Sequence, residues 1–435
     1  MLAAREDGDY RRALDLAWAA AARADGAELV CVLIELGTLL DVVGDWVEAE
    51  STLSRAVAIA DTLDGDDAES LLSRALASLA YAQGVQCHYV AADATLQRAR
   101  GLAVGGAVGS EVLLNSAALE VVRGRFAQAL ALIETAELDA QDAAAGSDRD
   151  KALVAVLSAR ANVHRALGEF DAAEKLLRRV IEETERLFGG RAIELASALN
   201  ELGVNCKYWG RFDDGEQLYL QAMEIALEAL GSDRSPLVTG LQHNLGGLEH
   251  ARGDYAAAEP HARRAVELRR AMAPEHLSLA LDEGALAAIL DGLGQREEAE
   301  QLLRSALVTL ERAPEVHRHE LAVTLNNLAA IRYRLGDLDE AAVLYGRALT
   351  IKRELLETDS PELAVSLNNL ALVLAKRGST DEALTMYEEA LALFRSGLQA
   401  THPSTAKCAR NYAKLLREAG RTDQAAALEA ELARE

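Results

Sequence analysis

The chain has 435 residues, which exceeds the size at which a single hydrophobic core stops growing, so several domains or an array of repeats is expected. Half of the residues are hydrophobic, but aromatic residues make up only 4% and there are six prolines, a composition that indicates closely packed helices. The formal net charge of −24 argues against non-specific binding to nucleic acids or to anionic lipids, because these are held mainly by lysine and arginine.

Cysteine usage and the first residues of the chain indicate a cytoplasmic protein. Cys31, Cys87, Cys206 and Cys408 lie far apart and form no C-x-x-C pair, which is typical of reduced thiols. The N-terminal sequence MLAAREDGDYRRAL is charged and polar, unlike a signal peptide. No apolar run reaches the roughly 18 residues of a membrane span. We therefore expect no contact with a membrane.

A repeated pattern of small residues runs through the whole sequence. A glycine anchor recurs at intervals of 36 to 44 residues, and the interval stays at 41 to 43 from Gly168 onward. The anchors are Gly8, Gly44, Gly124, Gly168, Gly210, Gly253, Gly294, Gly336, Gly378 and Gly420, with Cys87 in the third register. A small residue stands five residues after each anchor, and another stands seven residues before each one from Gly44 onward. Columns that keep this phase predict tandem repeats.

Each column has a physical explanation in a helix–turn–helix unit. The anchor ends the first helix (helix A) at a turn with positive φ, which only glycine adopts cheaply. Asp45, Asp254 and Asp337 directly follow their anchors and are predicted N-caps of the second helix (helix B). The small residues on both sides of the turn let the two helices pack closely. The apolar spacing between turns is helical and no strand pattern is present, so the fold class is all-α.

The units differ in regularity along the chain. Residues 1–7 are too few for a complete first helix A, and residues 101–110 and 139–150 look like loop insertions. Ser235-Pro236, Ser360-Pro361 and His402-Pro403 place proline at the first position of a new helix, whereas Pro260 is expected to bend a helix B. We divide the chain into irregular repeats over residues 1–150 and a regular array over residues 151–435, within one continuous solenoid.

Motifs of catalysis or metal binding are not apparent. His317 and His319 form an H-x-H pattern, but no third ligand lies near it in the sequence. The glycines at 105, 106 and 109 lack the preceding strand and the Lys-Ser/Thr of a phosphate-binding loop. We expect no catalytic residues, no metal, no cofactor and no small-molecule substrate.

The columns resemble those of the tetratricopeptide repeat (TPR), with a large and a small residue in helix A, the glycine turn, and alanine in helix B. The longer period and the motifs LNNLA (Leu325–Ala329 and Leu367–Ala371) and GDLDEA (Gly336–Ala341) resemble the repeats of kinesin light chain and its bacterial relatives. The resemblance implies a right-handed α–α superhelix of about ten to eleven repeats, with helices A on the concave face.

Given that placement, the register gives the residues of a partner-binding groove. The matching asparagines line a peptide groove in the kinesin-light-chain-like family, which implies this role for Asn200, Asn326 and Asn368. Other inner positions carry basic and aromatic side chains, which favour an acidic peptide. The predicted binding residues are Asn200, Lys207, Tyr208, His243, His250, Asn326, Tyr333, Arg334, Asn368, Lys376, Arg410 and Lys414.

Two alternatives remain open at this point. The asparagines could instead hydrogen-bond between neighbouring repeats, and the basic residues could form an ordinary solvated face. The predicted function is a non-catalytic scaffold that binds a protein or peptide, with no nucleic acid partner. The alternative is a regulatory or sensor part that controls a signalling enzyme, such as a nucleotide-switch ATPase or a caspase-like protease.

Overall fold

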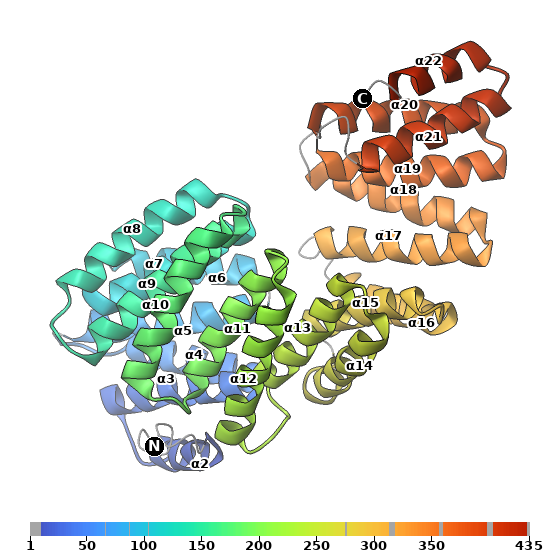
Figure 1. The fold of residues 1–435 in the computed structure, drawn as a ribbon. Helices are drawn as coiled ribbons and strands as arrows, with labels where there is room; N and C mark the ends of the chain where they lie inside the picture. The colour runs from blue at the N-terminus through green and yellow to red at the C-terminus, as the bar shows by residue number, and fades with distance from the viewer. Residues whose placement is uncertain are drawn as a thin grey trace. The chain divides into compact units, whose positions relative to one another are not determined.

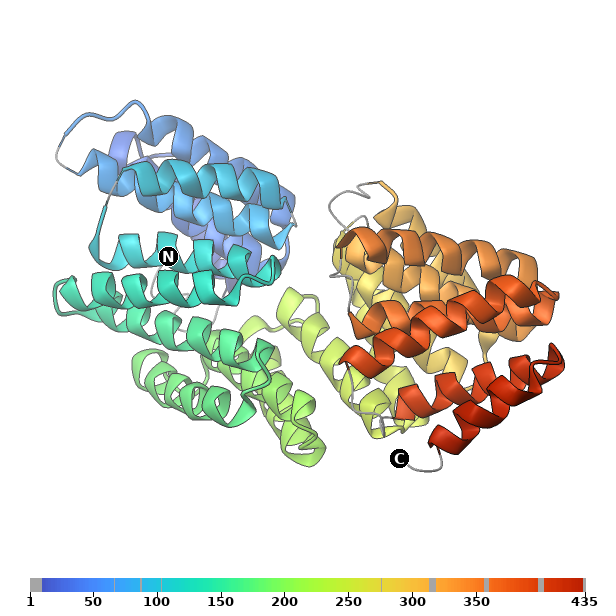
Figure 2. The same ribbon diagram turned by 90° about the horizontal axis from the view of Figure 1, so that it is seen from above.

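The computed structural model describes residues 10–65, 67–86, 88–102, 104–274, 276–312, 318–355, 360–397 and 403–432. These residues form 21 helices, α2 to α22, and contain no strand (Figures 1 and 2). The all-α class expected from the sequence is therefore confirmed. The chain divides into two compact units, Met1–His276 and Leu277–Glu435. This division lies inside the array that the sequence treats as regular, and the 150/151 boundary stays a prediction.

The helices of each unit follow one another in the order of the chain. The N-terminal unit contains α2 (Tyr10–Ala21), α3 (Gly26–Val43), α4 (Trp46–Ala60), α5 (Ala68–Val85), α6 (Tyr89–Gly101), α7 (Gly106–Val122), α8 (Phe126–Asp142), α9 (Ser147–Ala166), α10 (Phe170–Phe188), α11 (Ile193–Tyr208), α12 (Phe212–Leu230), α13 (Pro236–Arg252) and α14 (Tyr255–Met272). The C-terminal unit contains α15 (Leu277–Gly292), α16 (Arg296–Leu310), α17 (Arg318–Leu335), α18 (Leu338–Leu355), α19 (Pro361–Arg377), α20 (Thr380–Gly397), α21 (Pro403–Glu418) and α22 (Thr422–Leu432).

Successive helices pair as the repeat predicts, with the odd-numbered helices from α3 onward as helices A and the following even-numbered ones as helices B. Successive helices within each unit pack against one another, as α17 does against α16 and α18. Helix α2 is the helix B that follows the anchor at position 8, and its Ala13 is fully buried. Each unit is thus a stack of helical hairpins.

The turns between helices A and B have the predicted geometry. Every described anchor glycine has positive φ, from 72° at Gly124 to 90° at Gly336. The backbone N–H groups of Glu48, Ala257 and Glu340 each donate to the side chain of an N-cap aspartate, as predicted for Asp45, Asp254 and Asp337. Ser235 and Ser360 cap helices that begin with Pro236 and Pro361. The anchors Gly8 and Cys87, as well as His317 and His402, lie outside the described residues.

The small-residue columns lie where helices A and B approach most closely. A Cβ on Gly37 would lie 2.5 Å from Cγ of Leu53, and a Cβ on Gly203 would lie 2.6 Å from Cε1 of Tyr219. Ala161, on the same column, is fully buried. The columns therefore mark the contact between the two helices of a repeat, as the sequence predicts.

The two insertions expected at 101–110 and 139–150 are much shorter in the structure. Helix α7 begins at Gly106, α8 continues to Asp142, and α9 begins at Ser147. Glycine and short polar residues have low helix propensity, so these segments look like loops in the sequence. Packing against neighbouring hairpins outweighs this low propensity. Helix α14 also continues through Pro260, so the proline does not end the helix. The expected bend there stays a prediction.

The first and last helices of the N-terminal unit meet one another. Helix α3 contacts α13, and α2 contacts α12. The ring of Trp46 lies 4.5 Å from that of His276, and His276 Nε2 lies 3.1 Å from the carbonyl oxygen of Val85. The helices of this unit therefore close into a ring, with helices A on its inner side (Figures 1 and 2).

Candidate functional site

The predicted binding residues all lie on helices A, distributed over the two units. Helices α11 and α13 of the N-terminal unit carry Asn200, Lys207, Tyr208, His243 and His250. Helices α17, α19 and α21 of the C-terminal unit carry Asn326, Tyr333, Arg334, Asn368, Lys376, Arg410 and Lys414. Because the units are separate bodies, each set is treated as a surface of its own.

The asparagines form hydrogen bonds between neighbouring repeats. Asn244 donates to Asn200 Oδ1 at 2.8 Å, and Asn411 donates to Asn368 Oδ1 at 3.5 Å. These bonds follow the inter-repeat alternative that the sequence left open. Asn326 differs, because its Oδ1 is buried and has no hydrogen-bond partner among the described residues. A role of these asparagines in ligand contact stays a prediction.

A cation and an aromatic ring meet between α17 and α19. Lys376 Nζ lies 4.5 Å from the centre of the Tyr333 ring, a cation–π distance. Tyr333 lies two helical turns after Asn326, so both side chains belong to one face of α17. The next residue, Arg334, forms an ion pair with Asp291 of α15. The sequence register therefore brings Tyr333 and Lys376 together, whereas Arg334 is already neutralised by an acidic neighbour.

Helix α21 carries a row of exposed cations. Lys407, Arg410 and Lys414 follow one another at helical spacing, and all three side chains are exposed. Lys414 has only a distant carboxylate neighbour, Glu418, at 3.9 Å, and within the described chain neither Lys407 nor Arg410 forms an ion pair. The sequence analysis included Arg410 and Lys414 but missed Lys407, which stands thirteen residues before Gly420. Extending the register by one further turn of the helix would have found it.

Two of the predicted residues of the N-terminal unit have pKa values below their usual range. Burial, together with the charge of Arg165, lowers the pKa of Lys207, whose Nζ lies 5.2 Å from the centre of the Tyr208 ring. Burial also lowers the pKa of His250, which packs edge-on against Tyr255 at 5.4 Å. These two groups therefore lose part of their positive charge more readily than a surface lysine or histidine does.

A cavity lies inside the ring of the N-terminal unit. Its larger part has a volume of about 820 Å³, and a second part of about 570 Å³ shares Thr38, Lys151 and Phe188 with it. Ile34 and Thr38 line the cavity at ten and six residues before Gly44, and Asp41 lines it three before. Asn200, Lys414 and Lys207, which the sequence analysis places on the inner face, stand at these same distances before their own anchors. In the N-terminal unit, therefore, that face surrounds a cavity.

Enclosure by the ring raises the pKa values of two acids that line the cavity. Desolvation raises the pKa of Glu111 to about 7, against a smaller opposing effect of Arg74. Desolvation likewise raises the pKa of Asp41 to about 6, although a hydrogen bond from Trp46 lowers it in part. Glu111 is accessible to solvent, but the space that it faces is walled by protein, which weakens hydration of its charged form.

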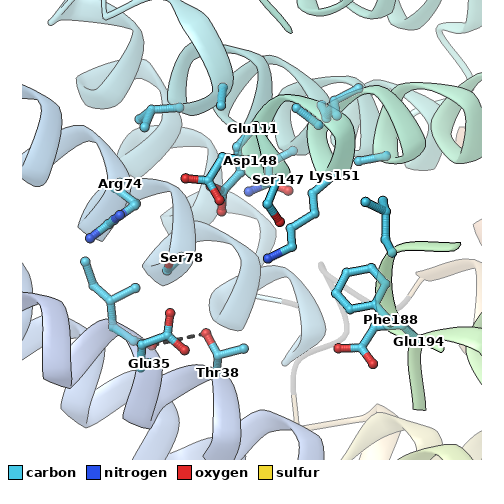
Figure 3. A pocket seen from close by; sticks show the side chains of 18 of the residues that line it. Glu35, Thr38, Arg74, Ser78, Glu111, Ser147, Asp148, Lys151, Phe188 and Glu194 are labelled. Carbon is cyan, nitrogen blue, oxygen red and sulfur yellow. Dashed lines mark hydrogen bonds between the residues drawn. The ribbon is translucent and has the colours of Figure 1, made fainter. Parts of the chain in front are cut away.

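The sequence analysis missed the charged residues of this cavity. Arg74, Glu111, Asp148 and Lys151 come from α5, α7 and α9, and Glu35 and Glu194 come from α3 and α11. All six line it in Figure 3. The repeats that carry Glu35, Arg74 and Glu111 were treated as irregular, and part of α9 was expected to be a loop. Arg74 and Glu111 each stand thirteen residues before an anchor, at the same register as Lys407, so the signal was present.

Helical hairpins stacked in register define this chain as an α-solenoid of the repeat type. The chain belongs to the tetratricopeptide repeat family, which matches residues 152–228, 237–311, 320–396 and 369–433. Such repeats typically mediate protein–protein interaction and are typically non-catalytic. No curated protein matches the chain.

Solved structures with similar folds include kinesin-light-chain-like TPR proteins. The chain is 26% identical to BtubC (BKLC) from P. vanneervenii, over 54% of this chain and 94% of that one, with a TM-score of 0.47. It is 21% identical to kinesin-light-chain TPR-like repeats from Podosopora anserina, over 47% and 95%, with a TM-score of 0.41. A STAND signal transduction ATPase with a TPR sensor from Pyrococcus horikoshii is 16% identical, over 80% and 52%, with a TM-score of 0.54.

Neither a candidate membrane span nor a cluster of metal ligands is found among the described helices. None of them is both long and apolar enough to cross a bilayer. Among the described residues, no three His, Cys, Asp or Glu side chains lie together as a metal would require. His319 lies at the start of α17, while its partner in the H-x-H pattern is outside the described chain.

Proposed function

We propose that the chain is a non-catalytic scaffold that binds an extended, acidic peptide segment of a partner protein on the helices A of its C-terminal unit. The observation that carries the proposal is the group of cations on α19 and α21. Lys376, Lys407, Arg410 and Lys414 lie on two adjacent helices A of a chain whose net charge is −24. Such a local reversal of sign steers acidic partners toward this face.

Two further features favour specific binding of a peptide over a non-specific electrostatic contact. The Tyr333 ring, with Lys376 over it, offers an apolar surface next to a cation. The buried Asn326 Oδ1 has no donor in the described structure, and a peptide N–H is the kind of group that would satisfy it. Together these residues supply an anchor for a side chain and an acceptor for a backbone.

The proposal is tested with an array of short synthetic peptides of graded acidic content. The wild-type protein is compared with the double variant Lys376→Glu plus Arg410→Glu. We expect the wild type to select acidic peptides and the variant to bind them at least about tenfold more weakly, which corresponds to about 1.4 kcal/mol. The matched control, Arg347→Glu plus Arg353→Glu on the outer helix α18, changes net charge equally and is expected to retain binding.

Two outcomes count against the proposal. If the outer control loses binding as much as the inner variant, the effect is one of net charge and not of the proposed face. If Asn326→Ala plus Asn368→Ala leaves recovery of a bound partner unchanged in a pull-down, backbone recognition by the asparagines is wrong.

The second candidate is a regulatory or sensor part of a signalling system. A neighbour in fold, the STAND protein from Pyrococcus horikoshii, carries a TPR sensor, but at 16% identity this likeness concerns the fold alone. The cavity of the N-terminal unit favours this candidate, because a sensor needs a place for the molecule that it senses. Co-purification of the chain with the products of neighbouring reading frames would distinguish it from a general scaffold.

A further inference from the structure

Within the described residues, four charged side chains of the cavity in the N-terminal unit, those of Arg74, Glu111, Asp148 and Lys151, form no ion pairs with one another. The carboxylates of Glu35 and Glu194 line the cavity as well. Arg74 and Lys151 have no carboxylate at ion-pair distance in the described chain, and within the same residues no cation pairs with Glu111 or Asp148. Arginines outside the cavity behave differently. Arg252, for example, contacts Asp213, Glu216 and Glu249 at 2.8 to 3.1 Å. The absence of pairing is therefore not general in the described chain.

The guanidinium of Arg74 has few hydrogen-bond partners in the described structure. Its Nη2 lies 3.3 Å from Cys31 Sγ, a weak acceptor, and its Nε is buried with no hydrogen-bond partner among the described residues. An arginine held in this way loses hydration without gaining a carboxylate, which is costly in the free protein. A ligand anion would supply the missing acceptor.

Lys151 is held toward the middle of the cavity by an aromatic neighbour. Its Nζ lies 5.4 Å from the centre of the Phe188 ring, and Figure 3 shows the side chain extended into the open space. Ser147 and Asp148 lie one turn before it on α9, so hydroxyl, carboxylate and ammonium groups reach the same region. Leu114 and Val108 give the wall of the cavity an apolar part.

These observations define the chemistry of an occupant. Cations and anions that form no ion pairs with one another, on a wall that also has an apolar part, are complementary to a molecule with both charges on an apolar frame. A volume of about 820 Å³ lies in the range of small-ligand sites. We propose that the cavity binds a small zwitterion of short-peptide size, with its carboxylate at Arg74 and Lys151 and its ammonium at Glu111 and Asp148. The sequence analysis expects no small-molecule ligand, and the inference does not rest on the proposed function.

The first test uses the whole chain and a library of di- to tetrapeptides with free termini. Peptides retained in equilibrium dialysis are identified by mass spectrometry, and their affinity is measured by calorimetry. The same peptides with an acetylated N-terminus or an amidated C-terminus are the matched controls. We expect free peptides to bind and the loss of either terminal charge to weaken binding at least about tenfold.

The second test uses variants of the cavity. Arg74→Gln, Glu111→Gln and Lys151→Gln are each expected to weaken binding at least about tenfold. Arg178→Gln, at an exposed position of α10 that does not line the cavity, is expected to leave binding unchanged. Circular dichroism verifies the fold of each variant, and the blocked peptides test the idea on the unmodified protein even if a variant does not fold. Lys376→Glu in the C-terminal unit must leave this binding intact, which separates it from the proposed function.

Three results would overturn the inference. The first is that no library peptide binds with a Kd below about 1 mM. The second is that blocked and free peptides bind equally well. The third is that binding persists in all three cavity variants.

Discussion

The residue that shows most directly why the small-residue columns exist is Gly203. An added Cβ there would lie 2.6 Å from the ring of Tyr219, which is fully buried and has no space into which to move. Helices α11 and α12 can approach this closely only because position 203 has no side chain. The columns are therefore consequences of packing, repeated once per hairpin.

Gly203→Ala is expected to destabilise the protein. Overpacking of this kind costs about 1–3 kcal/mol, which exceeds the gain in helix propensity. Gly240→Ala is the matched control, because it lies within α13 and an added Cβ there would meet nothing within 4 Å. The control is expected to stabilise the protein by about 0.5–1 kcal/mol. Chemical denaturation measures both, and equal effects of the two changes would refute the packing explanation.

Glu111 links the cavity to the pH dependence of stability. Its pKa rises from 4.5 to about 7 on folding because desolvation disfavours the charged form. Between these values the native state binds more protons than the unfolded state, so this group makes the protein less stable as the pH rises through the window. Arg74, Asp148 and Lys151 also face the cavity and set the local field.

Glu111→Gln is therefore expected to raise Tm relative to the wild type at about pH 8 and to have little effect at about pH 5. The measurement is thermal unfolding followed by circular dichroism across this range. Glu134→Gln, on the exposed face of the outer helix α8, is the control and should give a difference that does not depend on pH. A constant offset for Glu111→Gln as well would show that the cavity does not desolvate this carboxyl group.

At the scale of the element, each helix B is started by a cap and each helix A is ended by a glycine turn. Asp254 illustrates the first, since its side chain accepts the backbone N–H of Ala257 at 2.9 Å at the start of α14. This bond satisfies one of the four N–H groups that a helix leaves unpaired at its N-terminus.

Asp254→Ala is expected to lower the free energy of unfolding by about 1 kcal/mol. Asp254→Asn keeps an acceptor in the same place and is expected to change it by only a few tenths of that amount. Urea denaturation of the three proteins provides the measurement. If the alanine and asparagine variants were equally stable, the side chain of Asp254 would not act as a cap.

The helices and turns were predictable because the same local requirement recurs in each repeat. The positive φ of Gly336 and the burial of Ala341 follow from their places in that register. The start of α7 at Gly106 was not predictable in this way, because a glycine-rich segment carries no local helix signal and is held by packing against α8 and α9. Local propensity is a weak guide where neighbouring hairpins provide the stability.

At the scale of the whole molecule, the closure of the N-terminal unit into a ring could not be predicted from the sequence. The register predicts that Thr38 and Tyr81 face inward, but it does not reveal that α3 and α13 meet and turn an open groove into a ring around a cavity. Closure depends on the small rotation from each hairpin to the next, which accumulates over many repeats. The register placed Lys376 and Tyr333 on the same face but did not predict that they pair, and it did not predict the unpaired state of Arg74.

The central claim is that helices A, and not helices B, receive the partner. Hydrogen–deuterium exchange of the whole chain, with and without the acidic peptide that binds most tightly in the array, tests it most directly. The account predicts slower exchange in α17, α19 and α21 on binding, with α18 and α20 unchanged. Slower exchange confined to α18 and α20, or to the N-terminal unit, would contradict it.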